Sequence, residues 1–461
     1  MRSHSARWRS NQSAASDSAR GSSLSWCVLP STLRTTTPAL SSTFRCLEIV
    51  GLETPKPRVA TPTVAGPWAS RSTIPRRIGC ATALKESLAK RLTLACAAVS
   101  SLPLTPRAVR ARAVDVPVVR PVETAAGVLR SAPLVLIDVE TDEGLTGRSY
   151  VRTYTPLALR PLADLVENLA RVITGVAATP QEAHDALQRH VRLLGAQGLT
   201  GMAIAGIDMA LWDACAKARD VPLVALLGGR PEPIEAYASL RSMSPQPAAD
   251  EVSELRALGF TAFKLKVAGG SEPAPIRAVR EAAGDGARLM VDYNQSLTVD
   301  DAILRARALD AHELHWIEEP TRADDYPGHA RIAAAAKTPI QLGESWWGPH
   351  DMEKSIAARA SDHVTLDAMK IGGVSGWLRA ARLAEGAGLP ASSHTFPEIS
   401  AHLLAVTPTR HLLEYLDHAA PILTQPLEIR DGHALIPDRP GIGLEWDEAA
   451  VRRYVVSTRI G

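Results

Sequence analysis

The chain has 461 residues, of which 46% are hydrophobic and 22% charged, and its formal net charge is +2. That length is enough to bury a large core and to form two or more domains. A net charge so close to zero gives no bulk indication of a nucleic-acid or anionic-surface partner, and neither is expected.

The first hundred residues differ in composition from the rest. They contain 14 Lys or Arg against 4 Asp or Glu, and four of the five cysteines. They are rich in Ser, Thr and Pro and lack apolar periodicity, so a disordered or non-native extension is predicted over 1–103. An Arg- and Ser-rich, acid-poor composition is also typical of a transit peptide. The favoured interpretation is upstream sequence wrongly included in the reading frame, and a targeting or regulatory tail remains open as the second. A folded segment is the least favoured interpretation.

The cellular setting is predicted from what the rest of the chain lacks. Cys215 is the one cysteine beyond the extension, so no disulfide framework is expected. No run reaches the roughly 18 to 20 apolar residues that span a membrane. We therefore expect a cytoplasmic protein with no membrane partner.

Residues 104–232 predict an α+β capping domain. Alternating hydrophobicity between 108 and 151 indicates a meander of three antiparallel strands, and helices follow it. One of them, over 202–217, is apolar almost all round and should be buried. Within the meander, 120–131 is expected to be a mobile loop over a pocket. The last residues, 435–461, are expected to return and complete this domain.

A repeating pattern occupies 233–434. Short apolar runs end in ionisable residues at steps of 26, 26, 26, 23, 27 and 20 residues. One strand, one loop and one helix consume about that length, which predicts a (β/α) barrel of the modified TIM type. A parallel barrel gathers the C-terminal ends of its strands on one face, where active sites lie. The residues expected around that mouth are Lys264, Lys266, Asp292, Glu318, Glu344, Asp367, His394 and Glu414.

Three of these residues predict a metal site. Asp292, Glu318 and Glu344 are carboxylates on three consecutive strands, and when crowded together they repel and need a cation. Oxygen ligands without cysteine select a hard ion, Mg²⁺ first and Mn²⁺ second. Such an ion suits a small-molecule substrate with a carboxylate and a neighbouring oxygen, on which it stabilises negative charge.

Two bases are predicted beside the metal. Lys264 and Lys266 point to the same face of one strand, where each ammonium is expected to lower the other's pKa. His394 follows Asp367 by one βα unit, and an Asp bonded to one ring nitrogen raises the basicity of the other. Glu414 is expected to donate a hydrogen bond to the oxyanion if it is protonated. This set of residues predicts abstraction of the proton α to a carboxylate, through an enediolate.

Longer blocks around these residues resemble the enolase superfamily, mandelate racemase subgroup. The blocks are 263–267, 290–297, 316–321, 367–374, 392–394, 398–405 and 413–414. The resemblance extends from about residue 105 to 461, and the first hundred residues have no counterpart. It implies the same barrel with its capping domain, the same Mg²⁺ bound by the three carboxylates, and a homo-oligomer, by analogy an octamer.

The resemblance also implies catalytic roles. Lys266 would be the base for the S-configured substrate, and His394, with Asp367, the base for the R-configured one. Lys264 and Glu414 would hold the substrate carboxylate, and Glu414 would also be a general acid.

Further roles for the surrounding residues follow from the same resemblance. Asn294 would bond the α-hydroxyl, and Ser239 would contact the carboxylate. Lys370 would lie behind the His–Asp pair, whereas Glu319 is open between an outer position around the metal and a solvated charge.

The substrate pocket departs from the family pattern. Val122 and Leu129 keep it apolar and Tyr154 is present, but Arg152 stands where the racemase of this family has an aromatic residue. An unpaired arginine is costly to bury. Three interpretations stay open: Arg152 points to solvent, stacks on an aromatic ring, or binds a second polar group of the substrate.

The favoured function is racemisation of a 2-hydroxy acid such as mandelate, which makes the protein an isomerase of hydroxy acid catabolism. The main alternative is a hydro-lyase that dehydrates an aldonic or aldaric acid, because that reaction uses the same metal and the same carboxylate binding. A non-catalytic, metal-stabilised structural homologue is the least favoured.

Overall fold

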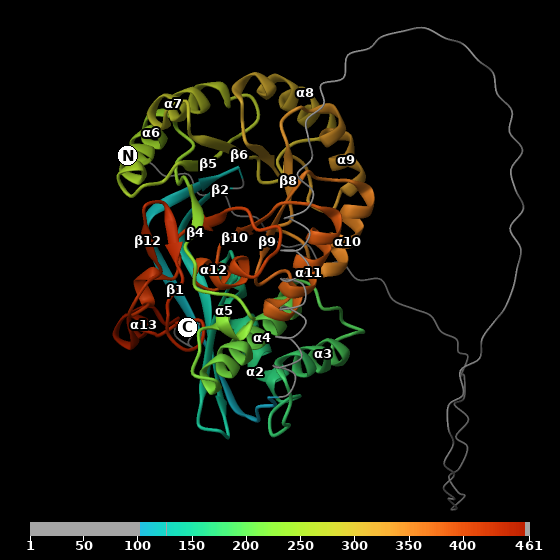
Figure 1. Cartoon of the computed structure of the whole chain (residues 1–461), viewed down its shortest axis with the longest axis vertical. Helices are drawn as coiled ribbons and strands as arrows, with labels where there is room; N and C mark the ends of the chain where they lie inside the picture. Colours follow the sequence, from blue (N-terminus) through green and yellow to red (C-terminus); the bar gives the residue numbers. More distant parts are fainter. Residues whose placement is uncertain (1–101, 126, 457–461) are drawn as a thin grey trace, which may run out of the picture. The chain divides into compact units, whose positions relative to one another are not determined.

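The computed structural model describes residues 102–125 and 127–456. The predicted extension over 1–103 lies outside these residues except for its last two. Within them, the chain forms an antiparallel sheet with helices and then a parallel barrel surrounded by helices, which confirms the predicted fold class (Figure 1).

The capping sheet is an antiparallel meander in the order β1-β2-β3. Its strands are β1 (Pro106–Thr124), β2 (Gly127–Thr141) and β3 (Thr146–Arg152). Strands β1 and β2 stay paired through Val122↔Leu129 to Thr124↔Gly127, after an irregularity that begins at Pro117. The prediction of a loop over 120–131 is therefore wrong in its conformation, because valine-rich sequence on both sides favours a strand and extends the hairpin. Its predicted place over a pocket is confirmed, since Val122 and Leu129 line a cavity.

Helices pack against this sheet and continue towards the barrel. They are η1 (Pro156–Ala158), α2 (Leu159–Ala170), α3 (Pro180–His190), α4 (Gly198–Ala218) and α5 (Leu223–Leu226). The prediction of a buried helix over 202–217 is confirmed by α4, whose side chains are buried on all faces up to Ala216. By length and composition α4 could cross a bilayer, contrary to expectation, but 94% of its apolar window is buried inside the protein, as in a core helix.

The barrel is built from parallel strands β4 to β11 with helices between them. Its strands are β4 (Ile234–Ser239), β5 (Ala262–Lys266), β6 (Arg288–Asp292), β7 (Trp316–Glu318), β8 (Ile340–Leu342), β9 (His363–Asp367), β10 (Ala391–His394) and β11 (Leu413–Tyr415). Its helices are α6 (Pro245–Ala257), α7 (Pro273–Ala283), α8 (Val299–Leu309), η2 (Asp310–His312), α9 (Tyr326–Ala335), α10 (Pro349–Ala358), α11 (Gly373–Ala387) and α12 (Pro397–Ala405). Strand β11 pairs with β4, and the Ser393 amide donates to the Leu412 carbonyl at 3.0 Å, which closes the barrel between β10 and β11.

The end of the described chain returns to the capping sheet. After η3 (Ala420–Ile422), a hairpin of β12 (Glu428–Arg430) and β13 (His433–Leu435) extends from β4. Helix α13 (Glu448–Tyr454) then lies against β1, where Arg112 and Glu448 form an ion pair at 2.8 Å.

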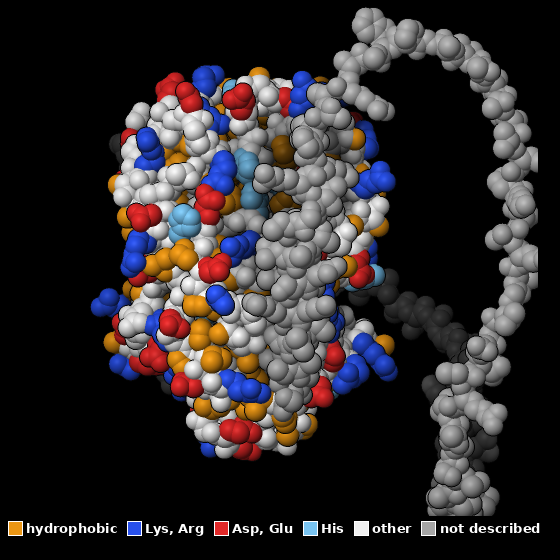
Figure 2. Space-filling model, in the orientation of Figure 1, with side chains coloured by type: hydrophobic (Ala, Val, Ile, Leu, Met, Phe, Trp, Pro, Cys, Tyr) orange, Lys and Arg blue, Asp and Glu red, His pale blue; other side chains and the backbone are white. Residues whose placement is uncertain are grey.

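The barrel interior supports the mouth from below. Tyr237, Met290 and Trp316 form a small buried cluster inside the strands. The Trp316 ring meets Tyr237 edge-on at 5.4 Å between centroids, and its Nε1 donates to Glu318 Oε2 at 3.0 Å. On the face seen in Figure 2, acidic and basic side chains of the described residues are interspersed rather than gathered by sign.

Candidate active site

The structure brings the predicted strand-end residues to one mouth of the barrel. Asp292 pairs in register with Lys266 on one side and Glu318 on the other, and His394 pairs with Asp367. They surround a cavity of about 530 Å³ that is lined by both the barrel and the capping sheet. Among the predicted residues, Ser239, Glu318, Glu319 and Asp367 lie behind the cavity wall rather than in its lining.

Asp292, Glu318 and Glu344 form a cluster that could hold a metal ion. One carboxylate oxygen from each lies within 4.8 Å of the others; the side chains of Asp292 and Glu318 are buried, and that of Glu344 is 12% exposed. Burial, with the neighbouring acids, raises the pKa of Asp292 and raises that of Glu318 to about 7. Acids held this close without water need a cation. The all-oxygen donor set fits a hard divalent ion such as Mg²⁺.

Lys264 bridges the acids at the centre of the site. Its Nζ lies 2.7 Å from Glu318 Oε1, 2.8 Å from Glu414 Oε1 and 3.8 Å from Asp292 Oδ2. Burial alone lowers the pKa of Lys264, but these carboxylates outweigh it and hold the pKa well above the ordinary value. The prediction of a lowered lysine pKa is therefore wrong for Lys264, because three acids face it.

Lys266 has different surroundings on the same strand. Its Nζ donates to Ser239 Oγ at 3.1 Å, and among the described residues no carboxylate oxygen lies within 4.0 Å of it. Lys266 lines the cavity, whereas Ser239 lies behind it. Both lysines line the cavity, but the structure separates one that is paired with carboxylates from one whose amine donates to a serine hydroxyl.

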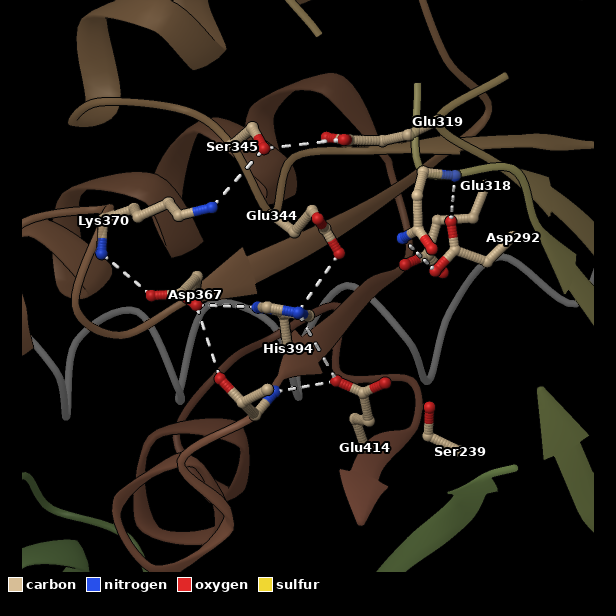
Figure 3. Close-up of polar contacts among 12 residues, drawn as sticks. Ser239, Asp292, Glu318, Glu319, Glu344, Ser345, Asp367, Lys370, His394 and Glu414 are labelled. Atoms are coloured by element: carbon tan, nitrogen blue, oxygen red, sulfur yellow. Dashed lines mark hydrogen bonds and ion pairs between the residues drawn. The ribbon is translucent and has the colours of Figure 1, made fainter. Parts of the chain in front are cut away.

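His394 lies between two carboxylates (Figure 3). Its Nδ1 is 2.7 Å from Asp367 Oδ2, and its Nε2 is 3.1 Å from Glu344 Oε2. Burial lowers the pKa of His394, but Glu344, Glu414 and Asp367 outweigh it and raise the pKa above the ordinary value. The other oxygen of Asp367 accepts from the Met369 and Lys370 amides at 2.9 Å, which fixes the orientation of the pair.

Glu414 is held as a carboxylate. It accepts from Lys264, and its Oε2 accepts from the Thr395 amide at 2.8 Å. Burial raises the pKa of Glu414, but Lys264, His394 and Lys266 outweigh it and hold the pKa far below its usual range. The sequence assigned Glu414 a hydrogen bond to the oxyanion only if it is protonated, and in this arrangement three cationic side chains favour its carboxylate form.

Asn294 lines the cavity and has one side-chain acceptor that no described residue uses. Its backbone N–H and its Nδ2 donate to Asp292 at 2.8 and 2.9 Å, which fixes the Asp292 carboxylate. The Asn294 Oδ1 is buried and has no hydrogen-bond partner among the described residues. A substrate hydroxyl could supply the missing donor.

Glu319 and Lys370 lie around the metal cluster. Gln295 Nε2 donates to Glu319 Oε2 at 2.8 Å, and burial, with the neighbouring Glu344, raises the pKa of Glu319 well above its ordinary value. Glu319 is therefore a buried acid, and the interpretation as a solvated charge is wrong. Lys370 Nζ lies 3.5 Å from Ser345 Oγ and 4.7 Å from the centre of the Tyr154 ring.

The capping sheet supplies the roof of the cavity. Val122, Leu129, Arg152 and Tyr154 all line it, as the sequence predicted. Arg152 is only 5% exposed, so the interpretation that it points to solvent is wrong. Its guanidinium stacks on the Tyr154 ring at 4.7 Å.

Several site residues were not predicted from the sequence. Thr395 binds both Glu414 and Asp367, and its position directly after a strand-end histidine was a usable signal. Gln341 donates to Glu318 at 3.0 Å from inside β8. His418 lines the cavity four residues after Glu414, and nothing in its sequence context distinguishes it from a packing histidine.

Known families match both parts of the described chain. The family described as Mandelate racemase / muconate lactonizing enzyme, N-terminal domain, matches residues 107–228, and the Enolase C-terminal domain-like family matches 247–450. A solved enolase from Bradyrhizobium, in complex with magnesium and mandelic acid, is 45% identical with a TM-score of 0.73, over 77% of this chain and 99% of that chain.

The curated relatives include a dehydratase and a cycloisomerase. The L-talarate/galactarate dehydratase of Salmonella typhimurium is 37% identical over 274 residues, which make up 58% of this chain and 69% of that protein. The 3,6-anhydro-alpha-L-galactonate cycloisomerase of Streptomyces coelicolor is 30% identical over 344 residues, which make up 72% of this chain and 94% of that protein.

Proposed function

The chain belongs to the enolase superfamily, in its mandelate racemase subgroup, and is an Mg²⁺-dependent enzyme; we propose that it racemises 2-hydroxy acids. The observation that carries the proposal is the pair of separate bases at the mouth. Lys266 ends β5 and His394 ends β10, and the metal-binding acids lie between them, Asp292 and Glu318 at the ends of β6 and β7 and Glu344 just after β8. Racemisation needs a base for each face of the α-carbon, whereas a structural metal site needs none.

The substrate is held by its carboxylate and its α-hydroxyl. When bound by Asp292, Glu318 and Glu344, Mg²⁺ supplies Lewis-acid stabilisation of the negative charge that develops on the carboxylate. Lys264, fixed between Glu318 and Glu414, adds a positive charge at the same place. The orphaned Oδ1 of Asn294 accepts the hydrogen of the α-hydroxyl.

The two bases exchange the α-proton. As the free amine, Lys266 takes the proton from the S-configured substrate, and the His394 imidazolium delivers a proton to the opposite face. The reverse reaction starts at His394, whose tautomer Asp367 fixes. The assignment of each base to one enantiomer follows the family pattern.

Glu414 acts as an acid only after the substrate has entered. A substrate carboxylate brings a further negative charge close to Glu414 and raises its pKa. A proton gained in this way would be donated to the developing oxyanion.

Mandelate is the first substrate to test, because a relative 45% identical was solved with magnesium and mandelic acid. The experiment is proton NMR of each mandelate enantiomer in D₂O with the protein and Mg²⁺, with polarimetry in parallel. We expect loss of the α-proton signal from both enantiomers together with decay of the optical rotation. Exchange of neither enantiomer of any 2-hydroxy acid would overturn the proposal.

Dehydration of an acid sugar is the second candidate. The raised pKa of His394 favours its protonated form, which could protonate a leaving β-hydroxyl after Lys266 has taken the α-proton. A relative 37% identical is a talarate/galactarate dehydratase. Formation of a 2-keto product from an aldonate or aldarate, without racemisation, would establish this reaction instead.

A further inference from the structure

Arg152 differs from the other arginines of the described chain. It is the one arginine there that is buried, at 5% exposure. The partly buried Arg112 and Arg241 form ion pairs with Asp138 and Glu251 at 2.8 and 2.9 Å. Arg152 has no carboxylate oxygen within 4.0 Å among residues 102–125 and 127–456; its Nε, like that of Arg112, has no hydrogen-bond partner there.

The guanidinium is held from one side by an aromatic ring. Tyr154 lies below it at 4.7 Å, and the ammonium of Lys370 lies 4.7 Å from the centre of the same ring. The backbone of Tyr154 has a φ of 58°, a left-handed conformation that is uncommon for a bulky residue. Stacking on the ring stabilises the positive charge of the guanidinium, but the ring accepts no hydrogen bonds from the N–H groups that lie in the guanidinium plane. The donors therefore still need an acceptor.

A second unpartnered group lines the same cavity. His418 is 7% exposed, and its Nε2 has no hydrogen-bond partner among the described residues. Burial, and then the nearby Arg152, lower the pKa of His418 well below its ordinary value, so the ring is neutral. A neutral imidazole can donate one hydrogen bond beside the guanidinium without adding a further charge.

We propose that Arg152 and His418 form a subsite for a second carboxylate, borne at the far end of the group attached to the substrate's α-carbon. A carboxylate accepts two parallel hydrogen bonds from a guanidinium and neutralises its charge. A bare phenyl group would do neither and would leave the charge buried and unpaired. The inference rests on the proposed function for the reacting end of the substrate, and it defines the substrate class as 2-hydroxy acids with a distal carboxylate.

The test uses two pairs of ligands that differ only at the distal end. Mandelate is compared with 4-carboxymandelate, and D-gluconate with D-glucarate, on the Mg²⁺-loaded full chain. Calorimetry gives Kd, and NMR in D₂O gives kcat/KM for exchange of the α-proton, the step that racemisation and dehydration share. We expect at least one diacid to be preferred over its monoacid partner by about 100-fold, as for a buried hydrogen-bonded charge pair.

The variant Arg152→Met should remove that preference, so that within this variant each diacid and its monoacid partner give the same Kd and the same kcat/KM. Arg148→Met is the matched control, because Arg148 is on the same strand but outside the cavity, near Asp138. It should keep the preference, and melting curves check the fold of both variants. Equal affinity for both members of each pair in the wild type, or a preference that survives in Arg152→Met, would overturn the proposal. Absence of exchange together with a diacid preference in Kd would reject the proposed reaction and retain the subsite.

Discussion

The two ends of the barrel use ionisable side chains in opposite ways. At the C-terminal mouth, Lys264 and His394 are buried within 2.7 to 2.8 Å of carboxylates, which raise the pKa of both groups. At the other end, His315, His363 and His411 come from the segments that open β7, β9 and β11. Their ring centroids are 5.0 to 5.8 Å apart, and the Nε2 atoms of His315 and His411 lie 3.1 Å from each other.

The two ends differ in whether a carboxylate lies beside the buried ionisable group. Burial lowers the pKa of His315 to about 4 and that of His411 to about 3, because no carboxylate compensates for the lost water strongly enough. These rings are neutral and pack as aromatic groups around Trp316. The histidines buried without an opposite charge pack as aromatic groups, whereas the cations buried beside carboxylates form the site at the mouth.

Removal of Mg²⁺ should have the largest effect, because it leaves three buried carboxylates at the mouth without their cation. We expect exchange of the α-proton to fall by at least about 10⁴-fold, since the ion both binds the substrate and stabilises its charge, each by several kcal/mol. At a concentration of 100 times Kd, Mg²⁺ should add about 2.7 kcal/mol to the free energy of unfolding. NMR exchange and melting curves before and after chelation measure both effects.

The control for the metal is a pair of variants. Asp292→Asn should abolish the dependence of the melting temperature on Mg²⁺. Asp324→Asn, whose side chain is 70% exposed, should keep it. A melting temperature that does not respond to Mg²⁺ in the wild type would contradict a resident ion at this cluster.

Replacing one base should have the next largest effect, and it should affect one enantiomer. Lys266→Met should lower exchange of the S-configured substrate by about 10²- to 10⁴-fold, because a positioned base contributes that much. Exchange of the R-configured substrate should persist through His394, and His394→Asn should show the converse. NMR in D₂O with each enantiomer measures this, and Lys354→Met on exposed α10 should match the wild type. Equal losses for both enantiomers in both variants would refute the two-base assignment.

Lowering the pH should have the smallest effect of these changes, a loss of stability at the end of the barrel that holds His315, His363 and His411. The folded-state pKa values of these histidines are depressed, so the unfolded chain binds protons first as the pH falls below about 6.5. The stability that they contribute is complete above that pH and is lost towards pH 4 and below. Because His411 is partly open to water, we expect His411→Gln to remove about 1 to 2 kcal/mol of the pH dependence.

Denaturant titrations between pH 7 and pH 4 measure the change in the free energy of unfolding. His350→Gln is the control, since that side chain is 78% exposed. The same slope in His411→Gln and in the wild type would show that the histidines do not cause the acid sensitivity.

The sequence by itself determined the barrel and the set of residues at its mouth. A βα unit has a nearly constant length and parallel strands end on one face, so regular spacing was enough to gather residues from Lys264 to Glu414. The same argument could have found Thr395, which directly follows a strand-end histidine but was not predicted. The burial of α4 was also readable from the sequence, because its apolar residues lie on every side of the helix.

Only the tertiary structure decided the charge states and the pairings. Lys264 and Lys266 are two residues apart, yet one meets three acids and the other a serine hydroxyl. The burial of Arg152 and the meeting of His315 with His411, 96 residues away, are likewise invisible in the chain order. Electrostatic energy in a buried site depends on distances of a few ångströms and on the exclusion of water. Spacing along a chain specifies neither of these quantities, which arise only when the strands close into a barrel and the capping sheet covers its mouth.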